Sequence, residues 1–168
     1  DHVIEVKTTR SVYRPRCVLL AIGRRGTPRK LGVPGEESTK VMYRLVDPEQ
    51  FRDRKVLVVG GGDSALEAAA SIAGTAGTEV SLSYRSGAFS RCKQKNRERI
   101  AALQQRGAMN VLMKSNVREI HAAKVELEQD GKNVVLDNDA VIVCAGGILP
   151  TPFLKEIGIQ VDTRYGTQ

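Results

Sequence analysis

The pattern of hydrophobic and polar residues is irregular over the first part of the chain. Residues 3–8 (VIEVKT) alternate between the two classes, which predicts a strand. The continuous apolar run at residues 17–22 (CVLLAI) predicts a buried strand, and Cys17 is expected to be a buried small hydrophobe within it. Glycine and proline break up the stretch that follows, which predicts a long loop. One helical turn, with Asp47 as its cap, is expected over residues 47–54.

The pattern becomes regular after this turn and predicts alternating strands and helices. Short strand-like segments are separated by segments rich in helix-forming residues. Ile100 and Leu103 should face the core from the second helix, and Cys144 should be a buried small hydrophobe. The expected strands are 55–59, 79–84, 109–114 and 140–144, and the expected helices are 63–73 and 94–106.

Residues 116–136 interrupt this order with a different pattern. The segments NVREIHAA, KVELEQ and NVVLD alternate between polar and apolar residues, and the turn sequence QDGK separates the last two. We therefore expect a small antiparallel meander before the last parallel strand. The predicted fold is α/β, with a Rossmann-like parallel sheet, crossover helices and a small antiparallel β-meander.

A glycine-rich turn between the first regular strand and helix is the strongest candidate binding site. Gly60, Gly62 and Ala65 form a G-x-G-x-x-A pattern. Gly60 permits the tight turn, Gly62 leaves room for a pyrophosphate, and Ala65 lets the helix pack closely on the strand. The start of the helix offers unpaired backbone N–H groups, and Ser64 adds a hydroxyl donor. The sequence therefore predicts a dinucleotide site.

The end of the next strand indicates which dinucleotide is bound. NAD-binding folds usually carry an acidic residue about 20 residues after the turn. Here the segment LSYRSGAFSR contains no acid, and Arg85 and Arg91 are available to grip a 2′-phosphate. NADPH is therefore expected rather than NADH. Tyr84 is a further candidate contact, and Glu67 is either a polar contact near the nicotinamide or a solvated helix residue.

Composition and charge limit the other partners. The net charge is +7, but aromatic residues make up only 4% of the chain and tryptophan is absent. The bases of a single-stranded nucleic acid would therefore have few aromatic side chains on which to stack. A nucleotide phosphate is a sufficient target for the basic segment around Arg85, and no nucleic-acid partner is expected. No apolar run approaches the roughly 20 residues of a membrane span. Three scattered cysteines and the lack of a leader sequence predict a cytoplasmic protein.

Four motifs in order resemble those of the thioredoxin-reductase-like pyridine nucleotide-disulfide oxidoreductases: AIGRRGTPRKLGVPGEE, VLVVGGGDSALEAA, YRSGAFSR and VIVCAGG. The resemblance covers essentially the whole chain and implies an NADPH domain inserted into a FAD domain. It implies that residues 1–46 are the end of a FAD-domain segment with its crossover linker, 47–148 the NAD(P)H-binding domain, and 149–168 the return linker. The glycine-rich FAD fingerprint and the Gly-Asp flavin motif are absent, so this chain alone is expected to hold no FAD and to be inactive.

The same resemblance implies roles for individual residues. Ile22 and Gly23 match positions near the flavin in the family. No catalytic side chain and no metal ligand are expected, because hydride transfer is the chemistry of the cofactors themselves. The family's nucleotide contacts correspond here to Gly62, Asp63, Ser64, Ala65, Arg85, Arg91, Ala145 and Gly146.

Two departures from the family bear on function. Ser86 stands where the family often has a second arginine, which weakens but does not remove the expected binding of a 2′-phosphate. Thioredoxin reductases carry a C-x-x-C where this chain reads VMYRLVDPEQFRDRKV, and that stretch holds no cysteine. The chain therefore resembles the cysteine-free, bacillithiol-disulfide-reductase-like members, in which flavin passes electrons straight to an acceptor. The expected parent is an FAD-dependent NAD(P)H oxidoreductase, with the FAD domain of the same polypeptide, an unknown electron acceptor and, by resemblance, a second copy as partners. The alternative is a non-catalytic NAD(P)H-sensing module.

Overall fold

The computed structural model describes residues 4–22 and 27–162, and the chain divides into two compact units. The terminal unit combines Asp1–Gly26 with Leu149–Gln168, and the core unit spans Thr27–Ile148. The core unit thus ends at residue 148, like the expected nucleotide-binding domain, but it begins before residue 47. The assignment of the terminal segments to a FAD domain stays a prediction.

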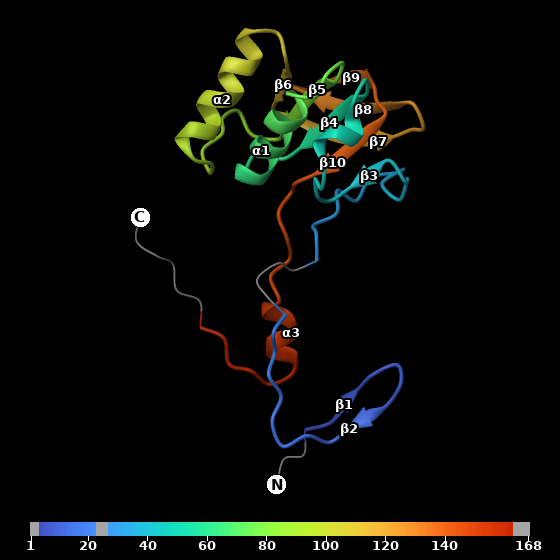
Figure 1. Cartoon of the computed structure of the whole chain (residues 1–168), viewed down its shortest axis with the longest axis vertical. Helices are drawn as coiled ribbons and strands as arrows, with labels where there is room; N and C mark the ends of the chain where they lie inside the picture. The colour runs from blue at the N-terminus through green and yellow to red at the C-terminus, as the bar shows by residue number, and fades with distance from the viewer. Residues whose placement is uncertain (1–3, 23–26, 163–168) are drawn as a thin grey trace. The chain divides into compact units, whose positions relative to one another are not determined.

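The core unit is built on a five-stranded parallel sheet with strand order β3-β10-β4-β5-β6 (Figure 1). β4 and β5 have the bounds that the sequence predicted, and β6 and β10 fall within their predicted ranges. β3 was not predicted, because two residues are too few to show a pattern. The strands are β3 (Val41–Met42), β4 (Lys55–Val59), β5 (Glu79–Tyr84), β6 (Asn110–Met113) and β10 (Ala140–Val143).

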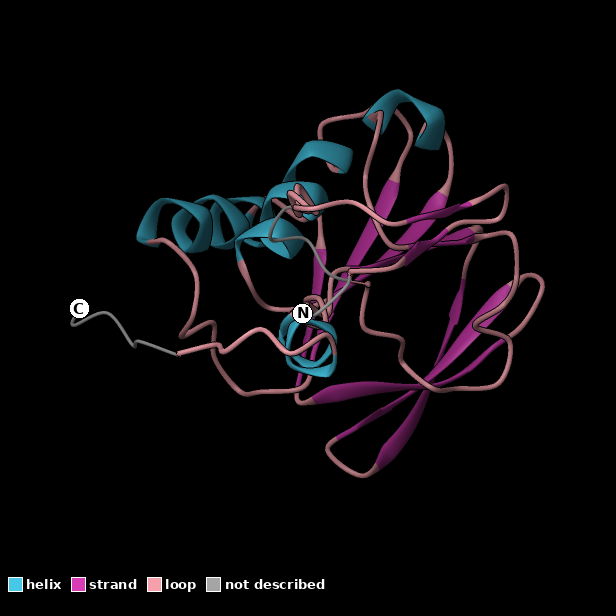
Figure 2. Ribbon diagram, turned by 90° about the horizontal axis from the view of Figure 1, so that it is seen from below, coloured by secondary structure: helices cyan, strands magenta, loops and turns pink. Residues whose placement is uncertain are grey.

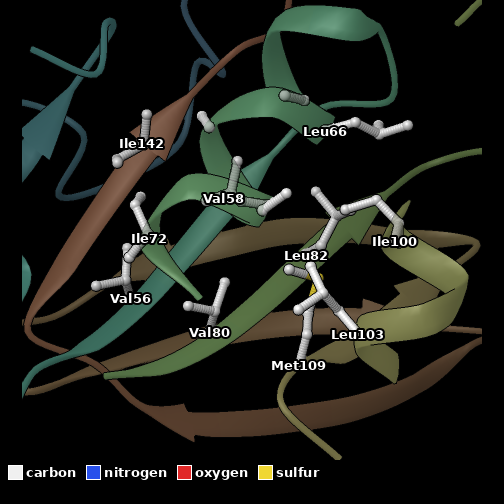
Figure 3. Packing of buried hydrophobic residues seen from close by; sticks show 14 of the residues in the cluster. Val56, Val58, Leu66, Ile72, Val80, Leu82, Ile100, Leu103, Met109 and Ile142 are labelled. Carbon is white, nitrogen blue, oxygen red and sulfur yellow. The ribbon is translucent and has the colours of Figure 1, made fainter. Parts of the chain in front are cut away.

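Two helices, α1 (Asp63–Ile72) and α2 (Gln94–Gln105), cover one face of this sheet (Figure 2). Side chains of β4 alternate between the faces, so that Val56 and Val58 belong to the helix-side core while Leu57 belongs to the opposite one. Figure 3 shows the helix-side core, where Ile100 and Leu103 of α2 pack inward as predicted.

A three-stranded antiparallel sheet covers the other face of the parallel sheet (Figure 2). Asp130 and Gly131, both with positive φ, form the two-residue turn between its last two strands. The expected meander and its Asp-Gly turn are therefore confirmed. The strands are β7 (Ser115–Ile120), β8 (Lys124–Gln129) and β9 (Lys132–Asp137).

A single buried carboxylate organises the loop before β3. Glu36 accepts hydrogen bonds from the backbone N–H groups of Leu31 at 2.6 Å and Gly32 at 2.7 Å, and from the Tyr43 hydroxyl at 2.8 Å. Burial favours the protonated acid, but these donors together outweigh it and hold the pKa of Glu36 below its ordinary value. Burial and the bond to Glu36 raise the pKa of Tyr43 to about 12.

One helical turn precedes β4. In η1 (Pro48–Phe51) the side chain of Asp47 accepts from the backbone N–H of Glu49 at 3.0 Å. The turn expected over residues 47–54 and its Asp47 cap are thus confirmed, and buried Phe51 anchors the turn to the core.

The terminal unit departs most from the sequence predictions. Residues 17–22 form no strand, Leu19 is 92% exposed and Cys17 is exposed, so the predicted buried strand and buried cysteine are both wrong. The described strands of this unit pair only with each other and offer this run no sheet to join. Its elements are β1 (Val6–Lys7), β2 (Val12–Tyr13) and α3 (Thr151–Glu156).

Candidate functional site

The carboxyl ends of three parallel strands meet at one edge of the sheet. Val59 of β4 is in register with Ser83 of β5 and with Val143 of β10, so the turns that follow these strands are neighbours. The chain runs outward from β4 through β5 to β6 and then returns to β10 on the other side of β4, and such a switch point in the strand order is where open α/β sheets bind ligands. The candidate site is built from these turns.

Gly60 occupies a position that has no room for a side chain. Its φ is +147°, and a Cβ there would lie 2.5 Å from the Cys144 carbonyl oxygen and 3.0 Å from Cβ of Ala65. Its N–H also donates to the carbonyl of Ser83 at 2.9 Å. Gly60 therefore brings β4, β5, β10 and the start of α1 into close contact.

Gly62 differs from Gly60 in having open space beside it. A Cβ at Gly62 would meet no atom within 4 Å, so a ligand can approach the backbone there. The Gly62 carbonyl accepts from the N–H groups of Ala65 and Leu66. Among the described residues no partner is found for the backbone N–H groups of Asp63 and Ser64, which together with the helix dipole favour an anion.

An aromatic pair, which the sequence did not indicate, flanks the glycine turn. The rings of Tyr84 and Phe89 stack with centroids 5.5 Å apart and planes 15° from parallel. The Tyr84 ring fills the space that a side chain at Gly61 would need. Three consecutive glycines were the only sequence signal for this contact, since the dinucleotide pattern itself requires only Gly60 and Gly62.

The loop from Arg85 to Lys93, called the basic loop below, follows β5. Arg85 and Arg91 are exposed, and within residues 4–22 and 27–162 neither guanidinium has an ion-pair or hydrogen-bond partner. Unpaired guanidinium groups on one short loop provide a positive site for an anion. Ser64, at the start of α1, is exposed as well.

Two acidic candidates point their side chains toward α2. Asp63 Oδ1 accepts from the backbone N–H of Lys93 at 2.8 Å and from Asn96 Nδ2 at 2.7 Å. Glu67 Oε1 accepts from the same Asn96 amide at 3.0 Å. Asn96 is only 4% exposed, and nothing in the sequence singled it out. A nucleotide contact by Asp63 or Glu67 stays a prediction.

Ala145 and Gly146 follow β10 at the same edge of the sheet. The Gly146 carbonyl accepts from the N–H of Arg29 at 3.0 Å, and Gly146 has a φ of +85°. The N–H of Ile148 donates to the carbonyl of Thr27 at 2.8 Å, so the two ends of the core unit are paired with each other. Ile22 is exposed in the terminal unit, and Gly23 lies outside the described residues.

The described residues also include one cluster of possible metal ligands and one half-buried thiol. Glu119, His121 and Glu126 come close enough to hold a metal ion, but His121 already faces both carboxylates and Lys124 contacts Glu126. Burial raises the pKa of the half-buried Cys144 thiol, which disfavours its reactive thiolate. None of the helices in the described part of the chain combines the length and apolar character that a membrane span needs.

Comparison with known proteins places this geometry in a family. The chain is 30% identical to a ferredoxin–NADP reductase of Ignicoccus hospitalis over 96% of its length, and 26% identical to the bacilliredoxin reductase of Bacillus subtilis over 99%. It spans about half the length of these relatives, 53% and 52% respectively.

Solved structures agree with these relatives. The bacillithiol disulfide reductase of Staphylococcus aureus superposes with a TM-score of 0.84 at 30% identity, over 95% of this chain and 50% of that one. A thioredoxin reductase of T. acidophilum, 23% identical, shares the fold with a TM-score of 0.75 over 95% of this chain and 54% of its own. A family match described as "Pyridine nucleotide-disulphide oxidoreductase" extends over residues 1–167. The chain belongs to the pyridine nucleotide-disulphide oxidoreductase family.

Proposed function

We propose that this chain is the NADPH-binding domain of a flavin-dependent oxidoreductase. One observation carries the proposal: an open helix N-terminus beside Gly62 and two guanidinium groups, those of Arg85 and Arg91, follow adjacent strands at the same edge of the sheet, and neither guanidinium has a partner among the described residues. The first suits the pyrophosphate of a dinucleotide, and the second suits an additional phosphate on its adenosine ribose.

The glycine turn would bind the pyrophosphate through its backbone. In the part of the chain that the structure describes, the N–H groups of Asp63 and Ser64 have no partner, and the absent side chain of Gly62 leaves space for the phosphate oxygens. The Ser64 hydroxyl is exposed and can donate to the same group. Ala65 holds α1 close to β4, which fixes the direction of these donors.

The basic loop would distinguish NADPH from NADH. A 2′-phosphate carries two negative charges or nearly so, and a guanidinium can bind it with two parallel hydrogen bonds. The segment between Tyr84 and Arg91 has no carboxylate to accept from a ribose hydroxyl. Tyr84 and Phe89 present stacked rings beside these arginines, where Tyr84 can contact the adenosine half of the nucleotide.

Ala145 and Gly146, which follow β10 at the same edge of the sheet, would contact the bound NADPH. A flavin held by the rest of the polypeptide would supply the hydride acceptor, and this chain would position NADPH for that transfer. The relatives are about twice as long as this chain, and the apolar run 17–22 is exposed, as a strand would be without its neighbours. The rest of the polypeptide would cover it.

The electrons would then reach an acceptor without a dithiol relay in this chain. No cysteine occurs between Cys17 and Cys92, so the C-x-x-C of thioredoxin reductases is absent from the stretch before β4. The names of the relatives point to ferredoxin or a low-molecular-weight disulfide as acceptor classes. We also propose that the parent is a homodimer, as the family resemblance implies.

Exchange of one charge on the basic loop tests the proposal. Arg85→Asp should weaken NADPH binding by at least tenfold, about 1.4 kcal/mol, while NADH binding is retained or improved, because a carboxylate repels phosphate and suits a ribose hydroxyl. Calorimetric titration measures both affinities.

Arg106→Asp is the matched control, because it makes the same charge change just before β6, at the opposite edge of the sheet. It should leave the ratio of the two affinities unchanged. Full NADPH affinity in the Arg85→Asp variant would contradict the proposed position of the 2′-phosphate.

A further inference from the structure

The basic loop has no regular structure of its own, so its conformation depends on contacts with its neighbours. The Ser86 carbonyl accepts from the N–H of Lys114 at 3.1 Å, which ties the start of the loop to the end of β6. Arg97 donates to the carbonyls of Cys92 at 2.9 Å and Phe89 at 3.4 Å, which ties its end to α2. These contacts lie on either side of Arg91, whose guanidinium has no partner within residues 4–22 and 27–162.

The loop ends at Lys93, which is the N-cap of α2 but makes no side-chain cap bond. A lysine side chain cannot accept a hydrogen bond, so it satisfies none of the N–H groups at the start of α2. Instead, the carboxylate of Asp63, at the first position of α1, accepts from the backbone N–H of Lys93 itself at 2.8 Å. A residue of the glycine turn thus fixes the end of the basic loop.

Asn96 completes the link between the two helices. Its buried amide donates both to Asp63 at 2.7 Å and to Glu67 at 3.0 Å, so two carboxylates one turn apart on α1 hold one residue in the first turn of α2. The hydrogen bonds from Lys93 and Asn96 lower the pKa of Asp63 and keep it ionised. Charged acceptors make stronger hydrogen bonds than neutral ones.

The direction of these bonds argues against a phosphate contact by this carboxylate. An anionic side chain beside the pyrophosphate would repel it, whereas the backbone N–H of the same residue is unpaired and suits a phosphate. One residue can therefore serve two purposes: its N–H faces the nucleotide while its side chain, through Oδ1, holds α2.

We propose that Asp63, acting through Lys93 and Asn96, is a positioning residue for nucleotide selectivity: it sets the position of the basic loop relative to the glycine turn. With the loop held in this position, Arg85 and Arg91 can bind the 2′-phosphate of a nucleotide whose pyrophosphate lies at the start of α1. The inference rests on the proposed NADPH binding. It predicts that loss of the Asp63 bonds weakens NADPH binding but not NADH binding, because NADH has no 2′-phosphate to place.

Two substitutions at Asp63 in the 168-residue chain separate positioning from charge. Asp63→Ala removes both acceptor bonds, and we expect NADPH affinity to fall about tenfold while NADH affinity stays within about twofold. Asp63→Asn keeps an oxygen that can accept both bonds but removes the charge, and it should restore most of the NADPH preference. Calorimetry with each nucleotide gives the ratio, and unchanged NADH binding shows that the glycine turn is intact.

A second pair of variants tests the same bond from its donor side. Lys93→Pro and Lys93→Ala both remove the ammonium group, but only proline also removes the N–H. Lys93 has a φ of −60°, which proline adopts without strain. We expect Lys93→Pro to bind NADPH more weakly than Lys93→Ala does, with equal NADH affinities.

The results also distinguish this inference from the proposed function. A wild-type chain without NADPH preference would refute the proposed function itself. A wild-type preference that survives Asp63→Ala, or that Lys93→Pro and Lys93→Ala share equally, would overturn the positioning role alone. An equal loss of NADPH and NADH affinity in Asp63→Ala would also overturn it and assign the carboxylate to direct nucleotide binding.

Discussion

Two runs of similar apolar residues behave in opposite ways in this chain. The run KVLVV forms β4, where Leu57 is 1% exposed, whereas CVLLAI forms no strand and Leu19 is 92% exposed. β4 pairs with β5 and β10 on its two edges and is covered by helices on one face and by the antiparallel sheet on the other. An apolar run becomes a buried strand only when the chain also provides its edges and both covering layers.

The largest expected effect contrasts the two regions directly. Leu82→Ala in β5 removes a side chain with 0% exposure, and it should lower the free energy of unfolding by about 3–4 kcal/mol, because a cavity remains between the sheet and its helices. Leu19→Ala should change it by less than about 0.5 kcal/mol. Urea unfolding followed by far-ultraviolet circular dichroism measures both. Equal losses would mean that Leu19 is packed in solution.

A smaller effect separates the two glycines of the binding turn. Gly60→Ala should lower the free energy of unfolding by about 2 kcal/mol, because its Cβ would meet the Cys144 carbonyl at an unfavourable φ. Gly62→Ala should leave stability within about 0.5 kcal/mol of wild type but lower dinucleotide affinity, since its methyl group would occupy open space beside the helix N-terminus. Paired urea unfolding and calorimetric titration test this, and a stable Gly60→Ala variant would contradict the close contact.

The smallest expected effect depends on pH. The pKa of Glu36 is lower in the folded chain than its ordinary value of 4.5, so its contribution to stability is complete above pH 4.5 and is lost as pH falls through the lowered pKa. Glu36→Gln should therefore lower the free energy of unfolding by about 1–2 kcal/mol near neutral pH and by less in acid. Glu37→Gln, at the exposed neighbouring residue, is the control. Equal pH profiles for wild type and Glu36→Gln would rule out this contribution.

The predictable part of the fold was the part with local periodicity. β4 was placed from the apolar run KVLVV, β5 from the strand-like segment EVSLSY, and α2 from two inward residues among many charged ones. The binding turn was found because Gly60, Gly62 and Ala65 have fixed spacing within one segment. In each case the sequence pattern and the element that it predicts lie in the same segment of the chain.

The features that the sequence did not predict depend on contacts between distant segments. The hydrogen bond that the Lys93 N–H donates to Asp63 requires β5 and the basic loop to bring α2 beside α1. The contact between Gly61 and the Tyr84 ring likewise joins two turns at the sheet edge. The wrong prediction of a strand at residues 17–22 has a related cause, because the described strands of the terminal unit pair only with each other and this run has no strand to pair with among them.

The most direct test of the central claim is calorimetric titration of this chain with NADPH and, separately, with NADH at one fixed salt concentration. The claim is that the turn at Gly62 binds a pyrophosphate while Arg85 and Arg91 bind a 2′-phosphate. It predicts that NADPH binds at least tenfold more tightly, a difference of about 1.4 kcal/mol. Equal affinities, or no binding of either nucleotide, would contradict it.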